Sequence, residues 1–333
     1  MTRWLAALTF VCLLHGAPVD AQTVAAEATQ SVGVSTEDIA GAATQVRALG
    51  EAVPGLRFLV EGAWGARSND TESDVFGTAY PYEDGFQVIE AYGEYFFAPQ
   101  RWVRSVKGGR YRTPFGIYAA SEHAYIGFLR PPLIRYGDYY ALSSGYLEHG
   151  VDVVVGAPRL SVELSVGTPG DVGDAIRRSG VDTVVRAEGI AGSLIVGVSF
   201  IDTTPYMPAQ WAKGRARFGG VDARWMGGGV QVRGEWLGGQ PFDGTTTTGG
   251  YADLIVHRPV MGPVTALLRA ERLAYTAPEP FALYSHRYTA GARIRLWKGL
   301  ATSVGISHQG GQLTQSRRTA IDVGVTYAAR HDF

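Results

Sequence analysis

The sequence has 333 residues, of which 46% are hydrophobic and 18% are charged, and its formal net charge is −1. This length suits two ordinary domains or one large all-β domain, and the near-zero charge offers no basic excess for a nucleic-acid partner. The apolar content excludes global disorder. The single cysteine, Cys12, excludes a disulfide framework and a cysteine-based metal site.

Residues 1–21 have the composition of a secretory signal peptide. Arg3 provides a positive start, Trp4 to Leu14 form an apolar stretch, and a small residue, Ala21, precedes an expected cleavage before Gln22. The apolar stretch is short for a membrane-spanning helix. We therefore expect an exported protein whose mature chain contains no cysteine.

Residues 22–54 show no regular alternation of apolar and polar residues. Ser35-Thr36-Glu37-Asp38 has the composition of a helix start, with a serine cap and two acidic residues in the first turn. We expect a leader that precedes the first strand, with a short helix or a partial plug as the alternative.

From residue 55 onward, apolar and polar residues alternate with a period of two. Along 160–167, Leu and Val alternate with Ser, Glu and Gly, and along 287–296 a second clear example carries arginines on its polar face. Such strands have one apolar and one polar face. No run of about 18 apolar residues follows the signal peptide, which excludes a helical membrane protein.

Strand length and loop pattern favour a transmembrane barrel over a soluble sandwich. The predicted strands are long enough to cross a bilayer at a tilt, tight connections alternate with extended ones, and aromatic residues gather beside the tight turns. Fourteen spans are predicted: 55–66, 84–97, 101–116, 144–156, 159–168, 180–188, 192–202, 214–226, 229–238, 249–258, 262–274, 285–297, 299–308 and 318–333.

The predicted fold class is therefore an all-β transmembrane antiparallel β-barrel of about fourteen strands, in the bacterial outer membrane. Sixteen strands are the alternative, if 117–143 contains a further hairpin. The expected organisation is a signal peptide at 1–21, a periplasmic leader at 22–54 and the barrel at 55–333. At Gly219-Gly220 the polar phase shifts, and we expect a β-bulge there.

The last strand carries the most specific signal. Its apolar face runs from Val323 through Tyr327 to the terminal Phe333. This face resembles the terminal strand of bacterial outer-membrane barrels, which ends in an aromatic residue. The resemblance implies that Tyr327 and Phe333 form an assembly signal read by the barrel assembly machinery.

Residues 107–116, Lys-Gly-Gly-Arg-Tyr-Arg-Thr-Pro-Phe-Gly, resemble a segment of the phosphate-selective porin O/P-like outer-membrane porins. The resemblance implies a diffusion pore, in which this segment ends an early strand and precedes a long loop folded into the barrel. It does not imply phosphate specificity, because the loop lysine cluster of the specific members is missing. The matching residues are Lys107, Arg110, Arg112, Pro114, Phe115 and Gly116.

Charged residues on the predicted inward faces support a wet lumen. An acidic wall is expected from Glu90, Glu94, Glu148, Asp152, Glu163, Asp182 and Glu188. A basic wall is expected from Arg215, Arg217, Arg224, Arg233, Arg269, Arg293 and Arg295. Pairing between strands is the alternative use of each of these charges. The two walls would face each other and give a mild preference for anions.

The connection 117–143 is the longest between predicted strands and is rich in aromatic and charged residues. We expect it to fold inward as a constriction, with Glu122, Arg130, Arg135 and Asp138 as its charged members. The alternative is a loop that packs over the mouth or supports trimer contacts.

The sequence thus predicts an outer-membrane porin for passive diffusion of small hydrophilic solutes or ions. A structural or adhesin-type barrel and an enzymatic barrel are the alternatives, although no nucleophile and base stand in a recognisable pattern. No cofactor and no metal site are predicted. The expected partners are outer-membrane lipid and lipopolysaccharide, the barrel assembly machinery, small hydrophilic solutes or anions, and further copies of the chain in a homotrimer, without nucleic acid.

Overall fold

The computed structural model describes residues 23–37, 39–68, 86–117, 127–135, 147–170, 180–205, 213–257, 262–277, 282–312 and 318–333. Its sixteen strands form one closed antiparallel barrel, in which each strand pairs with its neighbours in sequence and the first pairs with the last. The strands are β1 (Thr23–Ser35), β2 (Ile39–Val53), β3 (Leu56–Arg67), β4 (Gln87–Phe96), β5 (Val103–Arg112), β6 (Leu147–Ala157), β7 (Leu160–Gly170), β8 (Asp182–Ala191), β9 (Leu194–Thr203), β10 (Ala216–Gly227), β11 (Val230–Gln240), β12 (Thr246–Val256), β13 (Val264–Thr276), β14 (Ala282–Trp297), β15 (Leu300–Gly311) and β16 (Arg318–Asp332).

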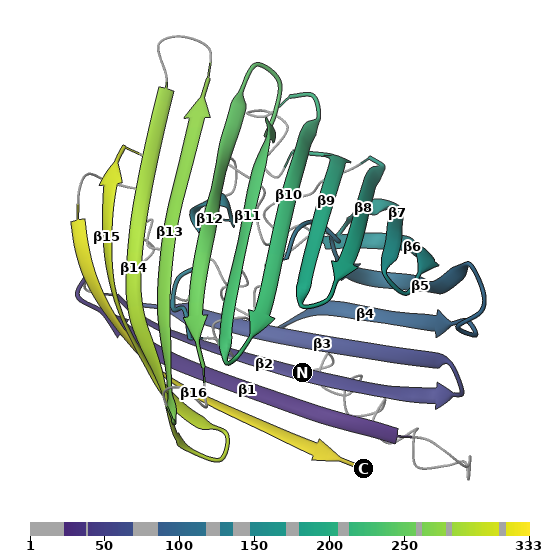
Figure 1. Ribbon diagram of the computed structural model, residues 1–333, viewed down its shortest axis with the longest axis horizontal. Coiled ribbons are helices and arrows are strands. Elements are labelled where there is room, and N and C mark those ends of the chain that lie inside the picture. Colours follow the sequence, from purple (N-terminus) through teal and green to yellow (C-terminus); the bar gives the residue numbers. More distant parts are fainter. Residues whose placement is uncertain are drawn as a thin grey trace.

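Short turns join the strands at one end of the barrel. Five of them need only two residues, at 54–55, 158–159, 192–193, 228–229 and 298–299. Figure 1 shows the turns that follow β10 and β14 at the lower ends of these strands. Because short turns face the periplasm in outer-membrane barrels, this end is the periplasmic one, where β1 begins and β16 ends.

The apolar faces of the strands point outward and the polar faces point inward, which is the reverse of a water-soluble protein. On β13, Leu268 points outward and is 51% exposed, whereas its neighbours Arg269 and Glu271 point inward and are 4% and 5% exposed. The same alternation on β16 exposes Val323 and Val325 on the outer face. An apolar outer surface around a polar interior is the arrangement that a lipid environment requires.

All fourteen strands predicted from 55 to 333 are present, as β3–β16, and the antiparallel barrel is confirmed. The sixteen-strand alternative is the correct one, but the extra pair does not come from 117–143. It comes from residues 23–53, which form β1 and β2. The expected leader at 22–54 is therefore wrong.

The N-terminal strands escaped prediction because small residues occupy both of their faces over much of their length. The outward face of β2 carries Ala40 and Ala42, and the inward face carries Gly41 and Ala43, so apolar and polar positions barely differ. The expected helix cap is a hairpin turn, in which the Glu37 backbone N–H donates to Ser35 Oγ at 3.2 Å. A serine hydroxyl caps a turn by the same chemistry as it caps a helix.

The bulge expected at Gly219-Gly220 is also absent. β10 pairs without a register shift with β9 and with β11 through this point, so its alternation runs unbroken. Register shifts occur instead at Glu51/Val53, Glu61/Gly62, Val103/Ser105 and Arg295/Trp297. The described residues contain one short 3-10 helix, Leu133–Arg135, and no helix long and apolar enough to cross a membrane.

Candidate functional site

The interior of the barrel is the candidate site. Sixteen strands enclose more space than the eight-stranded barrels that side chains alone can fill. The inward faces carry many charged side chains, and a described part of the connection between β5 and β6 lies among them. Residues 113–117 and 127–135 of that connection are described, and we call the second stretch the inner segment.

The connection turns inward directly after β5. Phe115 is 4% exposed and packs in a cluster with inward side chains of β8–β13, among them Phe218 and Leu237. The Gly116 backbone N–H donates to Ser199 Oγ on β9 at 3.2 Å. Gly116 has φ +68°, and a Cβ there would lie 2.0 Å from the Glu235 carboxylate, so the close approach requires glycine.

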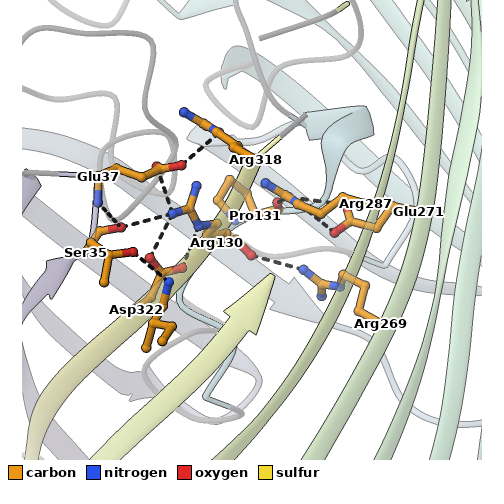
Figure 2. A network of polar contacts seen from close by, with 11 residues as sticks. Ser35, Glu37, Arg130, Pro131, Arg269, Glu271, Arg287, Arg318 and Asp322 are labelled. Carbon is orange, nitrogen blue, oxygen red and sulfur yellow. Dashed lines mark hydrogen bonds and ion pairs between the residues drawn. The ribbon is translucent and has the colours of Figure 1, made fainter. Parts of the chain in front are cut away.

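Arg130 fixes the inner segment to the seam where the barrel closes. Its Nε donates to Asp322 Oδ2 on β16 at 2.5 Å, and its Nη2 contacts Glu37 Oε2 in the β1–β2 turn at 2.9 Å. Arg318 Nε pairs with the other oxygen of Glu37 at 2.8 Å. Figure 2 shows these four side chains converging from the inner segment, β16 and the turn. The guanidinium is 4% exposed, so both carboxylates neutralise a buried charge.

Two arginines of the wall hold the backbone of the inner segment. Arg269 Nη1 donates to the Arg130 carbonyl at 3.0 Å, and Arg287 Nη2 donates to the Pro131 carbonyl at 2.5 Å. The Glu271 carboxylate accepts a hydrogen bond from the Leu133 N–H at 2.7 Å and another from Arg287 Nε at 2.9 Å. Figure 2 shows Arg269 and Arg287 beside the inner segment, with Glu271 next to Arg287. The wall arginines therefore act as backbone donors as well as charges.

Arg135 completes the attachment on the opposite side of the segment. Its Nη2 contacts Glu235 Oε1 on β11 at 2.5 Å and the Phe115 carbonyl at 2.9 Å. The inner segment is thus bonded to β11, β13, β14 and β16. Of the charged residues predicted for this loop, Arg130 and Arg135 lie inside the barrel, whereas Glu122 and Asp138 lie outside the described residues.

The predicted basic wall divides into buried and exposed members. Arg233 and Arg269 are buried and share Asp253, at 3.0 and 2.6 Å from their Nε atoms. Arg224 contacts Glu188 at 3.4 Å. Arg293 is half-buried and Arg295 is exposed, on the inward face of β14 near the periplasmic end. Arg295 forms no ion pair with any carboxylate that the structure describes.

Arg215 and Arg217 do not line the wall as predicted. Because β10 has no bulge, Arg217 lies on the outer face with Val221, and its predicted inward placement is wrong. Arg215 precedes β10, and both arginines pair with Asp202, at 2.5 and 2.8 Å. They form a local pair at the external end of the barrel.

The predicted acidic residues lie on one arc, formed by β4, β6, β7 and β8. Asp152 and Glu163 flank the Lys107 ammonium, at 3.6 and 3.5 Å. Glu90 pairs with Arg112 at 3.4 Å, and Asp182 accepts the Thr204 N–H at 3.2 Å. Glu148 accepts a hydrogen bond from Ser165. The remaining members are Glu94 on β4 and Glu188 on β8, both partly exposed.

The ring topology places the acidic arc opposite Arg293 and Arg295 of β14. In a closed ring of sixteen strands, β6 and β14 are eight strands apart in either direction. The arc centred on β6 therefore faces Arg293 and Arg295 across the interior.

Several residues of the interior were missed by the sequence reasoning. Glu61 is fully buried, and its carboxylate forms ion pairs with the guanidinium groups of Arg47 at 2.7 Å and Arg112 at 2.6 Å. Arg47 and Glu37 belong to the unpredicted N-terminal strands and their turn. Arg287 could have been found, because it shares a polar face with Arg293 and Arg295 in the sequence.

The remaining predicted site residues belong to the family-like segment 107–116 and to the last strand. In the family-like segment, Lys107 and Arg112 point inward, and Arg110 contacts His149 at 3.1 Å on an exposed face. Pro114 follows the end of β5. Tyr327 is 51% exposed on the outer face, and the Phe333 N–H donates to the Val24 carbonyl of β1 at 2.8 Å.

No family model matches the chain, and no curated protein matches its sequence. Solved structures do resemble it. OmpF of Salmonella typhi has a TM-score of 0.67 at 11% identity, covering 92% of this chain and 97% of that one. An anion-selective porin from Comamonas acidovorans has a TM-score of 0.63 at 13% identity, covering 94% and 99%. OmpT of Vibrio cholerae, an outer membrane protein in its trimer form, has a TM-score of 0.60 at 10% identity, covering 93% and 100%.

The chain therefore has the fold of the bacterial outer-membrane porins. It is a multi-pass β-barrel of that membrane, with its apolar belt facing the lipid.

Proposed function

We propose that the protein is a water-filled channel for passive diffusion of small hydrophilic solutes or ions. The observation that carries the proposal is the pairing of a lipid-facing apolar belt with a charged interior in a ring of sixteen strands. A charged wall is stable when water reaches it, whereas a dry barrel core would select apolar side chains.

We propose a mild preference for anions at the periplasmic end. Arg293 and Arg295 supply positive charge on β14, and Arg295 is exposed there. The acidic arc opposite is partly neutralised, since Lys107 lies between Asp152 and Glu163 and Arg112 pairs with Glu90. A field across a narrow lumen orients polar solutes and is screened less than in bulk water.

We propose that 117–143 acts as the constriction of this channel. The support is the set of bonds from Arg130, Arg135 and two backbone carbonyls to the wall, which hold the inner segment within the barrel. A loop fixed in this way narrows the path on the side of β11–β16.

We propose kinship with the phosphate-selective porin O/P-like family on the segment 107–116, without its phosphate specificity. Lys107, the basic residue that opens this segment, has two carboxylates beside it. A phosphate approaching this ammonium would meet both of them, so general diffusion fits the residues better than a dedicated phosphate site.

We further propose how the protein reaches its place. Residues 1–21 direct export, and Tyr327 and Phe333 on the last strand are recognised by the barrel assembly machinery. The chain assembles as a homotrimer, through the small outward residues of β1 and β2 such as Ala28 and Ala40. One structural neighbour is described in trimer form, which supports this assembly.

Single-channel recording in planar bilayers tests the central proposal. The purified mature barrel should produce discrete, ohmic conductance steps, and peptide and lipid hydrolysis should stay at the level of empty vesicles. A folded barrel that gives no conductance steps would contradict the porin function and favour a structural or adhesin-type role. Hydrolysis without conductance would favour an enzymatic barrel.

A further inference from the structure

The outer face of β13 carries an arginine within an otherwise apolar surface. Arg272 is exposed, and its partners across the sheet are Gly250 on β12 and His286 on β14. Its guanidinium forms no hydrogen bond or ion pair with any residue that the structure describes. A charged group on the lipid face is unfavourable near the bilayer centre and is tolerated near the interface.

The neighbouring aromatic residues indicate that Arg272 lies at the interface. Trp236 on β11 and Tyr284 and Tyr288 on β14 are about half exposed on the same outer surface. Trp and Tyr concentrate where the lipid tails meet the headgroups. Toward the periplasmic end of β13 the outward residues are Ala270 and Leu268, so Arg272 marks the upper edge of the apolar belt.

Below Arg272 an apolar groove of about 570 Å³ crosses the outer face from β11 to β16. Small side chains on neighbouring strands create its hollow, since Ala252 pairs with Ala270 across β12 and β13, and Ala290 follows on β14. Bulkier residues line its sides: Leu254, Leu268, Tyr288 and Ile306. The alanines form the floor of the groove, and the leucine and tyrosine side chains form its sides. This shape suits a flexible hydrocarbon chain.

Above Arg272 a second groove of about 470 Å³ is lined in part by polar side chains, among them Arg217 and Gln240. Its walls include the hydroxyl-bearing Thr246, Thr248 and Thr276, together with Ala274. On β13, Ala270 borders the lower groove and Ala274 the upper one, so Arg272 stands between the two. The outer face thus presents the Arg272 guanidinium and threonine hydroxyl donors directly above the apolar groove.

We propose that this surface is a binding site for a phosphorylated lipid of the outer leaflet. The phosphate binds the Arg272 guanidinium, with His286 and Thr248 as neighbouring donors, and one acyl chain lies in the groove over Ala252, Ala270 and Ala290. The planar guanidinium binds phosphate oxygens in a two-pronged geometry.

Charge complementarity favours a lipid over a second copy of the chain as the occupant. Asp202 is the carboxylate on the outer face of β9, and Arg215 and Arg217 already hold it. A second copy therefore brings no free acid from this strand to Arg272, whereas a phosphorylated headgroup supplies the anion and the acyl chain together.

Native mass spectrometry of the full barrel in detergent tests the site. The probes are dioleoyl phosphatidic acid and dioleoylglycerol, which share their acyl chains and differ in the phosphate. The wild type should retain phosphatidic acid in preference to dioleoylglycerol, and excess inorganic phosphate should not displace it. Arg272→Gln should weaken phosphatidic acid binding about tenfold, which is the loss of about 1.4 kcal/mol.

Two further variants separate charge from shape. Ala270→Phe fills the groove but keeps the arginine, and it should also weaken binding about tenfold. Arg57→Gln removes an exposed arginine from the periplasmic end and should bind as the wild type does. Wild-type binding by Arg272→Gln, equal retention of dioleoylglycerol, or displacement by inorganic phosphate would overturn the proposal. None of these results depends on conductance, so failure of the lipid site and failure of the porin function are distinguishable.

Discussion

Arg287 and Arg293 lie on the same inward face of β14, yet the two ends of this strand serve different purposes. Arg287 is 1% exposed, pairs with Glu271 and donates to the Pro131 carbonyl. Arg295 lies nearer the periplasmic end and is exposed, whereas the half-buried Arg293 lies beside Gly127 at the start of the inner segment. The external half of the strand is thus a structural anchor, and in the proposed channel the exposed Arg295, at the periplasmic end, is available to solutes.

The comparison teaches that the number of charges on a lumen wall does not give the charge that a solute meets. Arg233, Arg269 and Arg287 all face inward, but carboxylates and loop carbonyls occupy them. In the proposed channel, only the charges left exposed are accessible to a passing ion. Three variants test this distinction between charges that anchor the loop and charges that line the lumen.

Deleting residues 121–138 should have the largest effect. The deletion removes the inner segment with its two buried arginines, so the lumen widens on the side of β11–β16. Single-channel conductance should rise relative to the wild type in the same salt. Heat-modifiable migration in electrophoresis provides the control for folding. An unchanged conductance in the folded deletion variant would contradict the constriction.

Arg130→Met should lower the free energy of unfolding by about 3–5 kcal/mol, because it leaves the Asp322 and Glu37 carboxylates without their buried partner. Urea unfolding in detergent measures the change. Arg330→Met is the matched control, since Arg330 also pairs with two acids but is exposed, and it should leave the unfolding midpoint unchanged. Adding Asp322→Leu to Arg130→Met should recover part of the loss. Equal midpoints for the two single variants would refute the anchor.

Gly116→Ala should have a smaller effect than Arg130→Met. A Cβ at this position meets the Glu235 carboxylate at 2.0 Å and adds left-handed strain. Gly228→Ala has the same strain, at φ +58°, but open space around the Cβ. We expect about 1 kcal/mol of destabilisation for Gly228→Ala and about 1–3 kcal/mol more for Gly116→Ala. Similar values in urea unfolding would show that the loop does not press against β11.

The sequence was informative wherever the two faces of a strand differ in polarity. On β7, Leu and Val alternate with Ser and Glu, and this contrast predicted the strand. The same contrast predicted the other strands from β3 to β16. β1 and β2 were missed because small residues, above all alanine, occupy both faces over much of their length. At Gly219-Gly220 two adjacent glycines hid the phase of β10, and Arg217 was assigned to the wrong face.

The use of each inward charge could not be predicted, because it depends on contacts between distant segments. Arg130 meets Asp322 across 192 positions of sequence, and this contact exists only once the barrel has closed. The inward face of Arg269 followed from alternation alone. Its bond to the Arg130 carbonyl required the path of the inner segment, for which alternation carries no signal.

The reversal potential in a salt gradient tests the central claim most directly. In the double variant Arg293→Gln/Arg295→Gln it should shift toward cation preference, by an amount that shrinks as ionic strength rises. The matched double variant Arg215→Gln/Arg217→Gln removes the same charge from a pair already held by Asp202, and it should keep the wild-type reversal potential. Equal shifts in the two variants, or no shift at low salt in the first, would contradict the assignment of the solute-facing charge to β14.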